Sequence, residues 1–91
     1  MEFFHWNSLK NEQLKKERHI CFEDIVLRII SGHLLEVTDN PNQEKYPGQF
    51  IMIIDIDGYI YLVPFILEET GVFLKTIIPS RKYTKLYLKG Q

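Results

Sequence analysis

The sequence has a single cysteine, no long apolar run and no signal-peptide pattern. Cys21 stands alone, so no internal disulfide can form, and a reducing compartment is the simpler expectation. The apolar run at residues 50–54 is far shorter than the roughly 18 residues of a membrane span. The start of the chain lacks the basic residues and long apolar core of a signal peptide. We therefore expect a soluble, cytoplasmic protein with no membrane partner.

Motifs for metals and nucleotides are missing as well. No Cys/His cluster has zinc spacing, and the glycine-rich motifs of dinucleotide-binding proteins, P-loop NTPases and α/β-hydrolases are absent. Asp55 and Asp57 lie on one side of an expected strand, where two carboxylates can hold a cation. Because Asp57 also belongs to an expected turn, turn geometry is the simpler explanation. We expect no metal ion and no other cofactor.

The charge is close to neutral but is unevenly distributed. Eleven Lys and Arg against twelve Asp and Glu give a formal net charge of −1, which excludes a uniformly basic nucleic-acid-binding protein. Residues 1–74 carry a net charge of −6, whereas residues 75–91 hold five Lys and Arg and no acid. The 45% apolar and 13% aromatic content excludes intrinsic disorder, and 91 residues indicate one domain, 1–91.

The order of periodicities predicts an α+β fold. The aromatic residues 2–6 predict a short strand, and residues 9–18 an exposed helix that begins at Asn7 or Ser8. Apolar residues three and four apart then predict a second helix, which starts at Phe22 and is ended by a left-handed Gly32.

Beyond this helix the period changes from 3.6 to 2. Strands are expected over residues 34–37, 50–56, 59–66 and 72–78. Asp57-Gly58 predicts a type I′ hairpin turn, and Ser80 can cap a last helix over residues 81–88. The order β-α-α-β-β-β-β-α predicts an antiparallel β-sheet with two N-terminal helices and a short C-terminal helix, packed on one face.

The last helix is the first candidate for binding an anion. Arg81 and Lys82 lie in its first turn, where free N–H groups also attract a phosphate or carboxylate. Two further cations and two tyrosines that can contact RNA follow on the same helix: Lys85, Lys89, Tyr83 and Tyr87. The alternative is a solvent-exposed amphipathic helix that keeps the protein soluble.

A second cluster, Lys15, Lys16, Arg18 and His19, lies where the first two helices meet. Cations at a helix C-terminus are favoured by the macrodipole, which is a sufficient structural explanation. In the functional interpretation, this corner and the last helix form two walls of one basic groove. Cys21 takes the place of a capping Ser or Thr and has no base beside it, so we interpret it as a half-buried thiol and not as a nucleophile.

Four segments resemble the BrnT family of bacterial toxins. They are F-x-W-N-x-x-K-N at residues 4–11, K-K-E-R-H-I-C-F-E-D at 15–24, I-D-G-Y-I-Y-L-V-P-F at 56–65 and I-I-P-S-R-K-Y-T-K at 77–85. The family's sequences run F-E-W-D-x-x-K-N, then R-K-H-G-[IV]-S-F-E-E, and end in I-S-A-R-K-A-T-K-x-E-x-x-x-Y. The likeness covers nearly the whole chain in the same order, and the combination of its two ends is fairly specific.

The resemblance implies a RelE-like fold and a metal-independent endoribonuclease that inhibits translation. It also implies a co-expressed antitoxin of the ribbon-helix-helix type. This antitoxin binds operator DNA, and the toxin is associated with that DNA only through the antitoxin. Arg18 stands where the family has histidine, and His19 where it has a cap glycine. The chain therefore either uses His19 in place of that histidine or has lost activity.

Metal-free RNA cleavage needs a base for the 2′-OH, cations for the developing phosphorane charge and an acid for the leaving oxygen. The candidate catalytic residues are Arg81, Arg18, His19 and Tyr87, and the candidate RNA-binding residues are Lys15, Lys16, Lys82, Lys85, Lys89 and Tyr83. Among them, His19 and Tyr87 are the candidates for proton transfer. The alternative function is a non-catalytic module, derived from the toxin fold, that binds a protein or nucleic acid.

Overall fold

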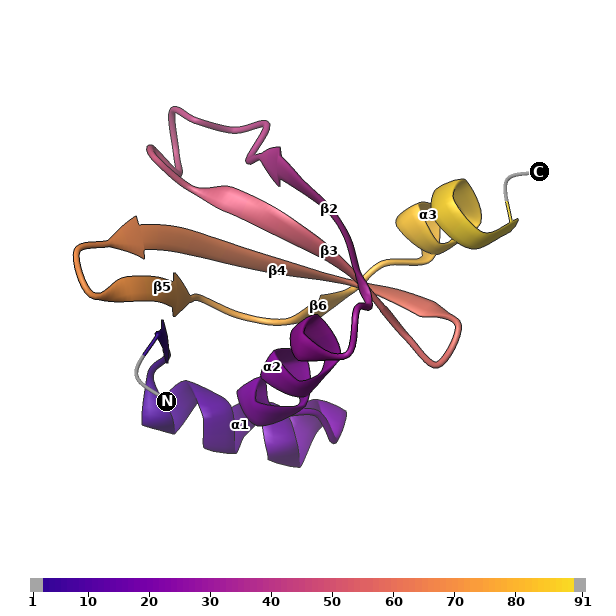
Figure 1. Cartoon of the computed structure of the whole chain (residues 1–91), viewed down its shortest axis with the longest axis horizontal. Coiled ribbons are helices and arrows are strands. Elements are labelled where there is room, and N and C mark those ends of the chain that lie inside the picture. Colours follow the sequence, from indigo (N-terminus) through magenta and orange to yellow (C-terminus); the bar gives the residue numbers. More distant parts are fainter. Residues whose placement is uncertain (1–2, 90–91) are drawn as a thin grey trace.

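The helices and strands follow the order that the sequence predicts, with one additional short strand. The computed structural model describes residues 3–89 as an α+β fold (Figure 1). The helices are α1 (Ser8–Arg18), α2 (Phe22–Ile30) and α3 (Arg81–Thr84), which continues as a π-helical turn, η1 (Lys85–Lys89). The strands are β1 (Phe4–His5), β2 (Leu34–Asp39), β3 (Phe50–Ile56), β4 (Tyr59–Glu68), β5 (Gly71–Leu74) and β6 (Ile78–Pro79). Within residues 3–89, no helix is long and apolar enough to cross a membrane.

The six-stranded sheet is mixed, so the prediction of a wholly antiparallel sheet is wrong. Its strand order is β1-β5-β4-β3-β2, and β6 pairs with β4 off this path. All the pairs are antiparallel except that β1 runs parallel to β5. β1 has only two paired residues, and the side-chain pattern of so short a strand contains no information about its direction.

Polar side chains fix the start of α1 and tie it to α2. The Asn7 side chain accepts a hydrogen bond from the backbone N–H of Lys10 at 2.9 Å, which confirms the expected N-cap. The buried Asn11 side chain accepts from the N–H of Phe22 at 2.8 Å and donates to Glu23 at 2.9 Å. The latter bond is the main reason why the pKa of Glu23 is lowered. Asn11 thus joins the middle of α1 to the first turn of α2.

The turns expected at Gly32 and at Asp57-Gly58 are confirmed. Gly32 follows the end of α2 with φ 86°, and Asp57 and Gly58 have the two positive φ angles, 53° and 84°, of a type I′ turn. Asp55 accepts from the N–H of Gly58 at 2.9 Å, and Asp57 forms an exposed ion pair with Arg28 at 3.3 Å. Both carboxylates therefore have partners within the turn region.

The strand expected over residues 72–78 is broken by a bulge into β5 and β6. The pairing of these strands with β4 places three residues, 75–77, opposite two, 63–64. Pro64 has no N–H to donate to this segment, so a regular ladder cannot continue there. The extra residue turns Ile77 into the core, where its side chain is fully buried. The prediction of one continuous strand is wrong for this reason.

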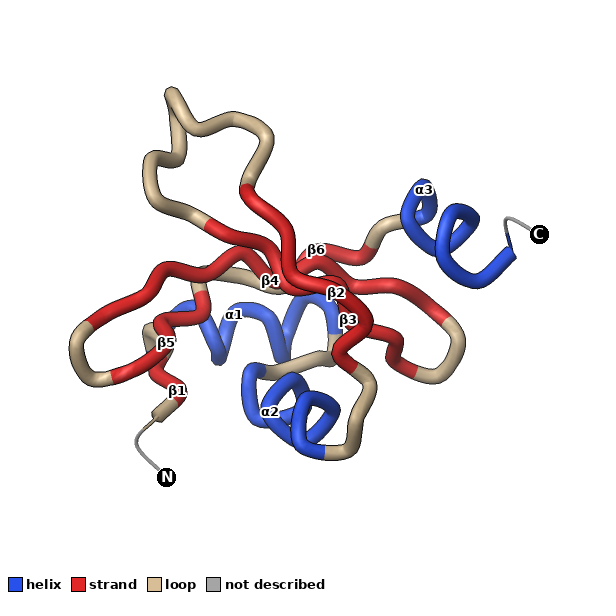
Figure 2. The backbone as a smooth tube through the Cα atoms, turned by 45° about the horizontal axis from the view of Figure 1, so that its top comes forward, coloured by secondary structure: helices blue, strands red, loops and turns tan. Residues whose placement is uncertain are grey.

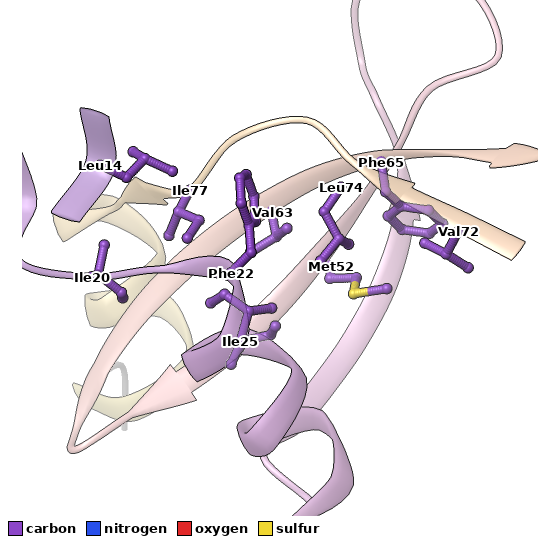
Figure 3. Packing of buried hydrophobic residues seen from close by; sticks show 11 residues of the cluster. Leu14, Ile20, Phe22, Ile25, Met52, Val63, Phe65, Val72, Leu74 and Ile77 are labelled. Atoms are coloured by element: carbon purple, nitrogen blue, oxygen red, sulfur yellow. The ribbon is translucent and has the colours of Figure 1, made fainter. Parts of the chain in front are cut away.

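The core lies between one face of the sheet and the helices α1 and α2 (Figure 3). Its buried residues are Leu14, Ile20, Phe22, Ile25, Met52, Ile54, Val63, Phe65, Val72, Leu74 and Ile77. Phe22 and Ile25 belong to the apolar stripe of α2, and Met52 and Ile54 alternate along β3. Burial of each such side chain contributes about 1.5–3 kcal/mol, so this packing fixes the two N-terminal helices on the sheet.

The segment formed by α3 and η1, called the C-terminal helix below, lies on the other face of the sheet (Figure 2). Glu36 pairs with Ile53 across β2 and β3, and these residues alternate with Met52 and Ile54, which face the core. The hydroxyl of Tyr87 donates a hydrogen bond to the carboxylate of Glu36 and so holds the helix on that side. The helix itself is confirmed, although its second half is π-helical, but the prediction that all helices pack on one face is wrong.

Candidate nucleic-acid interface

Three of the predicted cations line an open surface depression beside the β3–β4 hairpin. The depression has a volume of about 760 Å³, within the usual range of ligand sites. Its lining residues are Tyr59, Pro79, Arg81, Lys82, Lys85 and Leu86. The three cationic side chains are exposed, and within residues 3–89 none of them forms an ion pair. With three positive charges and no acid among the described residues that line it, the depression attracts an anion.

Hydrogen bonds hold the first turn of the C-terminal helix against the start of β4. The Ser80 side chain accepts from the N–H of Tyr83 at 3.0 Å, which confirms the expected N-cap. The N–H of Ser80 donates to the carbonyl of Ile60 at 2.9 Å, and the buried Thr84 hydroxyl accepts from the N–H of Ile60 at 2.8 Å. Two backbone groups of one residue of β4 therefore fix the position of the cations.

Tyr59 is the member of this depression that sequence reasoning missed. It is the first residue of β4, directly after the hairpin turn, and 37% of its surface is exposed. Its ring meets that of Tyr61 edge to face, with centroids 5.8 Å apart and an angle of 66° between the planes. The sequence shows two tyrosines on one face of a strand beside a turn. It does not show that the C-terminal helix reaches this turn.

The two tyrosines of the C-terminal helix make contacts within the protein. The rings of Tyr83 and Tyr87 stack with centroids 6.0 Å apart and planes at 12°. The hydrogen bond from Tyr87 to Glu36 is the main cause that raises the pKa of Tyr87 to about 12. Its hydroxyl therefore stays protonated at neutral pH, which suits a proton donor and not a general base. Neither Tyr83 nor Tyr87 is among the described residues that line the cationic depression.

Arg18 and His19 lie in a second depression, of about 380 Å³, next to the first. The guanidinium of Arg18 donates to the carbonyl of Ile77 at 2.5 Å, which holds the end of α1 beside the bulge. Tyr61 lines the second depression and contacts Tyr59 of the first, so the two depressions adjoin. The structure therefore brings Arg18 and His19 to a depression next to the cations of the C-terminal helix, and the prediction that the two clusters line one groove is wrong.

The other predicted residues at the N-terminal cluster differ in their environments. His19 ends α1 in a left-handed conformation, φ 57° and ψ 36°, and its N–H donates to the carbonyl of Lys15 at 3.1 Å. The ammonium of Lys15 forms an exposed ion pair with Glu12 at 3.3 Å, and this contact raises the pKa of Lys15. Lys16 is exposed, and the side chain of Lys89 lies outside the described part of the chain.

The structure also places the residues considered for metal binding and nucleophilic chemistry. Within residues 3–89, no three His, Cys, Asp or Glu side chains gather as a metal site requires. Cys21 is the N-cap of α2, is half-buried as expected, and its N–H donates to the Asp24 carboxylate at 3.2 Å. Burial is the main cause that raises the pKa of the Cys21 thiol, which keeps it protonated and unreactive.

No protein-family model, curated protein sequence or solved structure matches the chain. The structure itself shows an α+β protein with a mixed sheet and a cationic surface depression. The likeness to a toxin family rests on the sequence motifs.

Proposed function

We propose that this protein is a BrnT-like toxin of RelE-like fold, a metal-independent endoribonuclease that inhibits translation in the cytoplasm. The observation that carries the proposal is the depression in which Arg81, Lys82 and Lys85 gather without an acid. A phosphodiester needs cations both for binding and for the charge that develops in the transition state. These residues also belong to the S-R-K-x-T-K segment, one of the two ends whose combination makes the resemblance fairly specific, so that segment supplies the cationic surface.

Two further positions support the resemblance. The cap glycine of the family falls on His19, whose φ of 57° is a conformation that glycine adopts freely and other residues adopt rarely. The asparagine that ends the first family motif is Asn11, whose buried side chain bonds to Phe22 and Glu23. The family's glycine suits the left-handed backbone at position 19, and its asparagine suits the hydrogen bonds at position 11. Neither reason depends on catalysis.

In the proposed reaction the 2′-OH of RNA loses its proton to a base and its oxygen attacks the adjacent phosphorus; the bond from phosphorus to the 5′-oxygen of the next nucleotide breaks, which leaves a 2′,3′-cyclic phosphate, and the 5′-oxygen takes up a proton. Arg81 and its two neighbouring cations bind the phosphate and stabilise the charge on its non-bridging oxygens, and Arg18, in the adjoining depression, and the exposed Lys16 are proposed to bind other phosphates of the same RNA. His19 is the proposed general base, because an imidazole nitrogen can accept a proton and the residue lies in the adjoining depression. Tyr87, with its pKa raised to about 12, fits only the role of a proton donor.

A toxin that degrades the RNA of the cell that makes it has to be neutralised by a partner. We therefore include in the proposal a co-expressed antitoxin of the ribbon-helix-helix type, which would also be the link to operator DNA. Expression of this chain together with a neighbouring reading frame tests the partner. Growth should be restored by the antitoxin and not by an unrelated ribbon-helix-helix protein.

The test of the ribonuclease is the expression of the parent, Arg81→Ala and Lys45→Ala, scored for growth and RNA integrity. Lys45 is a matched control, because its exposed ammonium lies over the Tyr46 ring at 5.4 Å and lines neither depression. The parent and Lys45→Ala should arrest growth and degrade RNA. Arg81→Ala should lose about 10²-fold or more in cleavage rate, as the removal of one oxyanion-stabilising group does elsewhere. If Arg81→Ala acts like the parent, the assignment is wrong.

The second candidate function is a non-catalytic module derived from the toxin fold. It is favoured by one observation: the lining of the cationic depression, within the part of the chain that the structure describes, includes no histidine and no carboxylate, although catalysis needs proton transfer. This candidate predicts that the purified protein binds RNA or an acidic partner and leaves structured and ribosome-bound RNA intact. Binding without cleavage would favour the module over the enzyme.

A further inference from the structure

The cationic depression contains apolar side chains that an isolated anion would not use. Tyr59 is 37% exposed and Leu86 is 61% exposed, and both line the depression together with Pro79. A free phosphate or carboxylate would contact only the cations. A ligand that also covers the apolar side chains must combine a negative charge with a flat or apolar group, and a nucleotide does so.

The ring of Tyr59 is held in place before any ligand arrives. Its backbone pairs with Ile56 directly at the type I′ turn, and its ring contacts the ring of Tyr61 edge to face. The next residue of β4, Ile60, is bonded to Ser80 and Thr84 at the start of the C-terminal helix. The position of Tyr59 relative to the helix that carries the cations is therefore set by rigid elements, which lowers the entropic cost of binding.

We propose that Tyr59 is a base-stacking residue and that the depression binds single-stranded RNA, with one base on the ring and neighbouring phosphates on Arg81, Lys82 and Lys85. The inference rests on the proposed function for its choice of RNA as ligand. A single strand is required because in a duplex both faces of each base are covered by its neighbours. Stacking on an aromatic ring is tolerant of sequence, so the site selects unpaired RNA and not a particular base.

The test uses a short oligouridine RNA that contains one 2-aminopurine and carries 2′-O-methyl groups. These groups remove the attacking hydroxyl, so the protein binds the RNA without cleaving it. Tyr59→Leu should weaken binding about 5- to 150-fold, the range for the loss of one stacked base. It should also abolish the fluorescence quenching that stacking causes. Tyr59→Phe, which keeps the ring, should bind and quench as the parent does.

Four controls separate stacking from folding, from charge and from binding to duplex RNA. Tyr46 is a matched tyrosine, 39% exposed and outside the depression, so Tyr46→Leu should bind like the parent. Lys82→Ala should weaken binding and reduce its dependence on salt, whereas Tyr59→Leu should leave the salt dependence unchanged. An RNA duplex of the same length should compete poorly. The circular dichroism spectrum of Tyr59→Leu should match that of the parent.

Each other outcome has a defined meaning. If the parent binds RNA and Tyr59→Leu binds and quenches equally well, the stacking inference is overturned and the proposed function stands. If the parent binds duplex and single-stranded RNA with equal affinity, the stacking inference is likewise overturned and the proposed function stands. If the parent binds no RNA, both this inference and the proposed function are overturned.

Discussion

At His19 the chain holds a bulky side chain at backbone angles that favour glycine. The left-handed conformation, φ 57°, brings the side chain of any other residue close to its own backbone, which costs about 1–2 kcal/mol. The same residue is the proposed general base. A histidine at this strained position therefore lowers the stability of the fold and places the proposed base in the depression next to the cations.

We expect His19→Gly to raise the free energy of unfolding by about 0.5–1 kcal/mol, because glycine relieves the strain but gains entropy when unfolded. Urea denaturation measures this change. His19→Ala keeps the strained backbone and should give no gain. The glycine variant should also lose RNA cleavage, since the proposed base is gone. A glycine variant that is more stable and fully active would contradict the assignment of the base.

Tyr87 provides a test by pH. Its bond to Glu36 raises its pKa from the ordinary value of 10 to about 12. Because the pKa is higher in the folded state, this stabilisation is complete below pH 10 and is lost as the pH rises towards 12. An ultraviolet titration of tyrosinate should show one tyrosine that ionises last. Glu36→Gln should move that ionisation back towards pH 10, and Tyr87→Phe should remove it.

At the scale of elements, the C-terminal helix depends on a few bonds to β4. The hydroxyl of Thr84 accepts from the N–H of Ile60 and also donates to the carbonyl of Ser80 at 2.7 Å. Thr84→Val keeps the shape of the side chain but leaves this buried N–H without an acceptor. A buried donor without a partner costs about 1–3 kcal/mol.

We therefore expect Thr84→Val to lower the free energy of unfolding by about 1–3 kcal/mol and to increase hydrogen exchange at the N–H of Ile60. Exchange measured residue by residue distinguishes this local effect from general unfolding. Thr38→Val is the control, because the Thr38 hydroxyl donates only to the neighbouring Asp39 carbonyl, at 3.3 Å. If exchange at Ile60 does not change, the helix is not held by this bond.

The elements that the sequence predicts well are those with local causes. Asn7 and Ser80 cap their helices, and Asp57-Gly58 forms its turn, because each depends on residues within a few positions. The break after β5 was not predictable in this way. It arises where the segment meets Pro64 of another strand, and no pattern within residues 72–78 shows which residues lie opposite.

At the scale of the whole molecule, the candidate site also combines residues that the sequence predicts with a residue that only the fold brings there. The cations of the C-terminal helix are visible as an acid-free stretch, so the sequence predicts them. Tyr59 is separated from Arg81 by more than a full strand and loop. It joins the cations only because β6 returns the chain to the start of β4. A residue that enters a site through sheet topology has no local signal in the sequence.

The segregation of charge predicts how RNA binding responds to salt. The net charge of −1 conceals a basic end, so attraction comes from the three cations of the depression and not from the molecule as a whole. For a single strand held by three cations, the logarithm of the binding constant should fall with the logarithm of salt concentration at a slope of about −2. A slope near zero would show that the cations do not contact phosphates.

The bulge at residues 75–77 has a consequence for self-association. An exposed strand edge with regularly spaced backbone groups is a template on which a second chain can aggregate. β6 offers little such edge, since it has two residues, follows the irregular segment and ends in Pro79, which has no N–H. The cationic depression therefore lies beside a sheet edge that resists pairing with another copy. This part of the sheet edge is thereby protected from aggregation, beside the surface at which we propose that RNA binds.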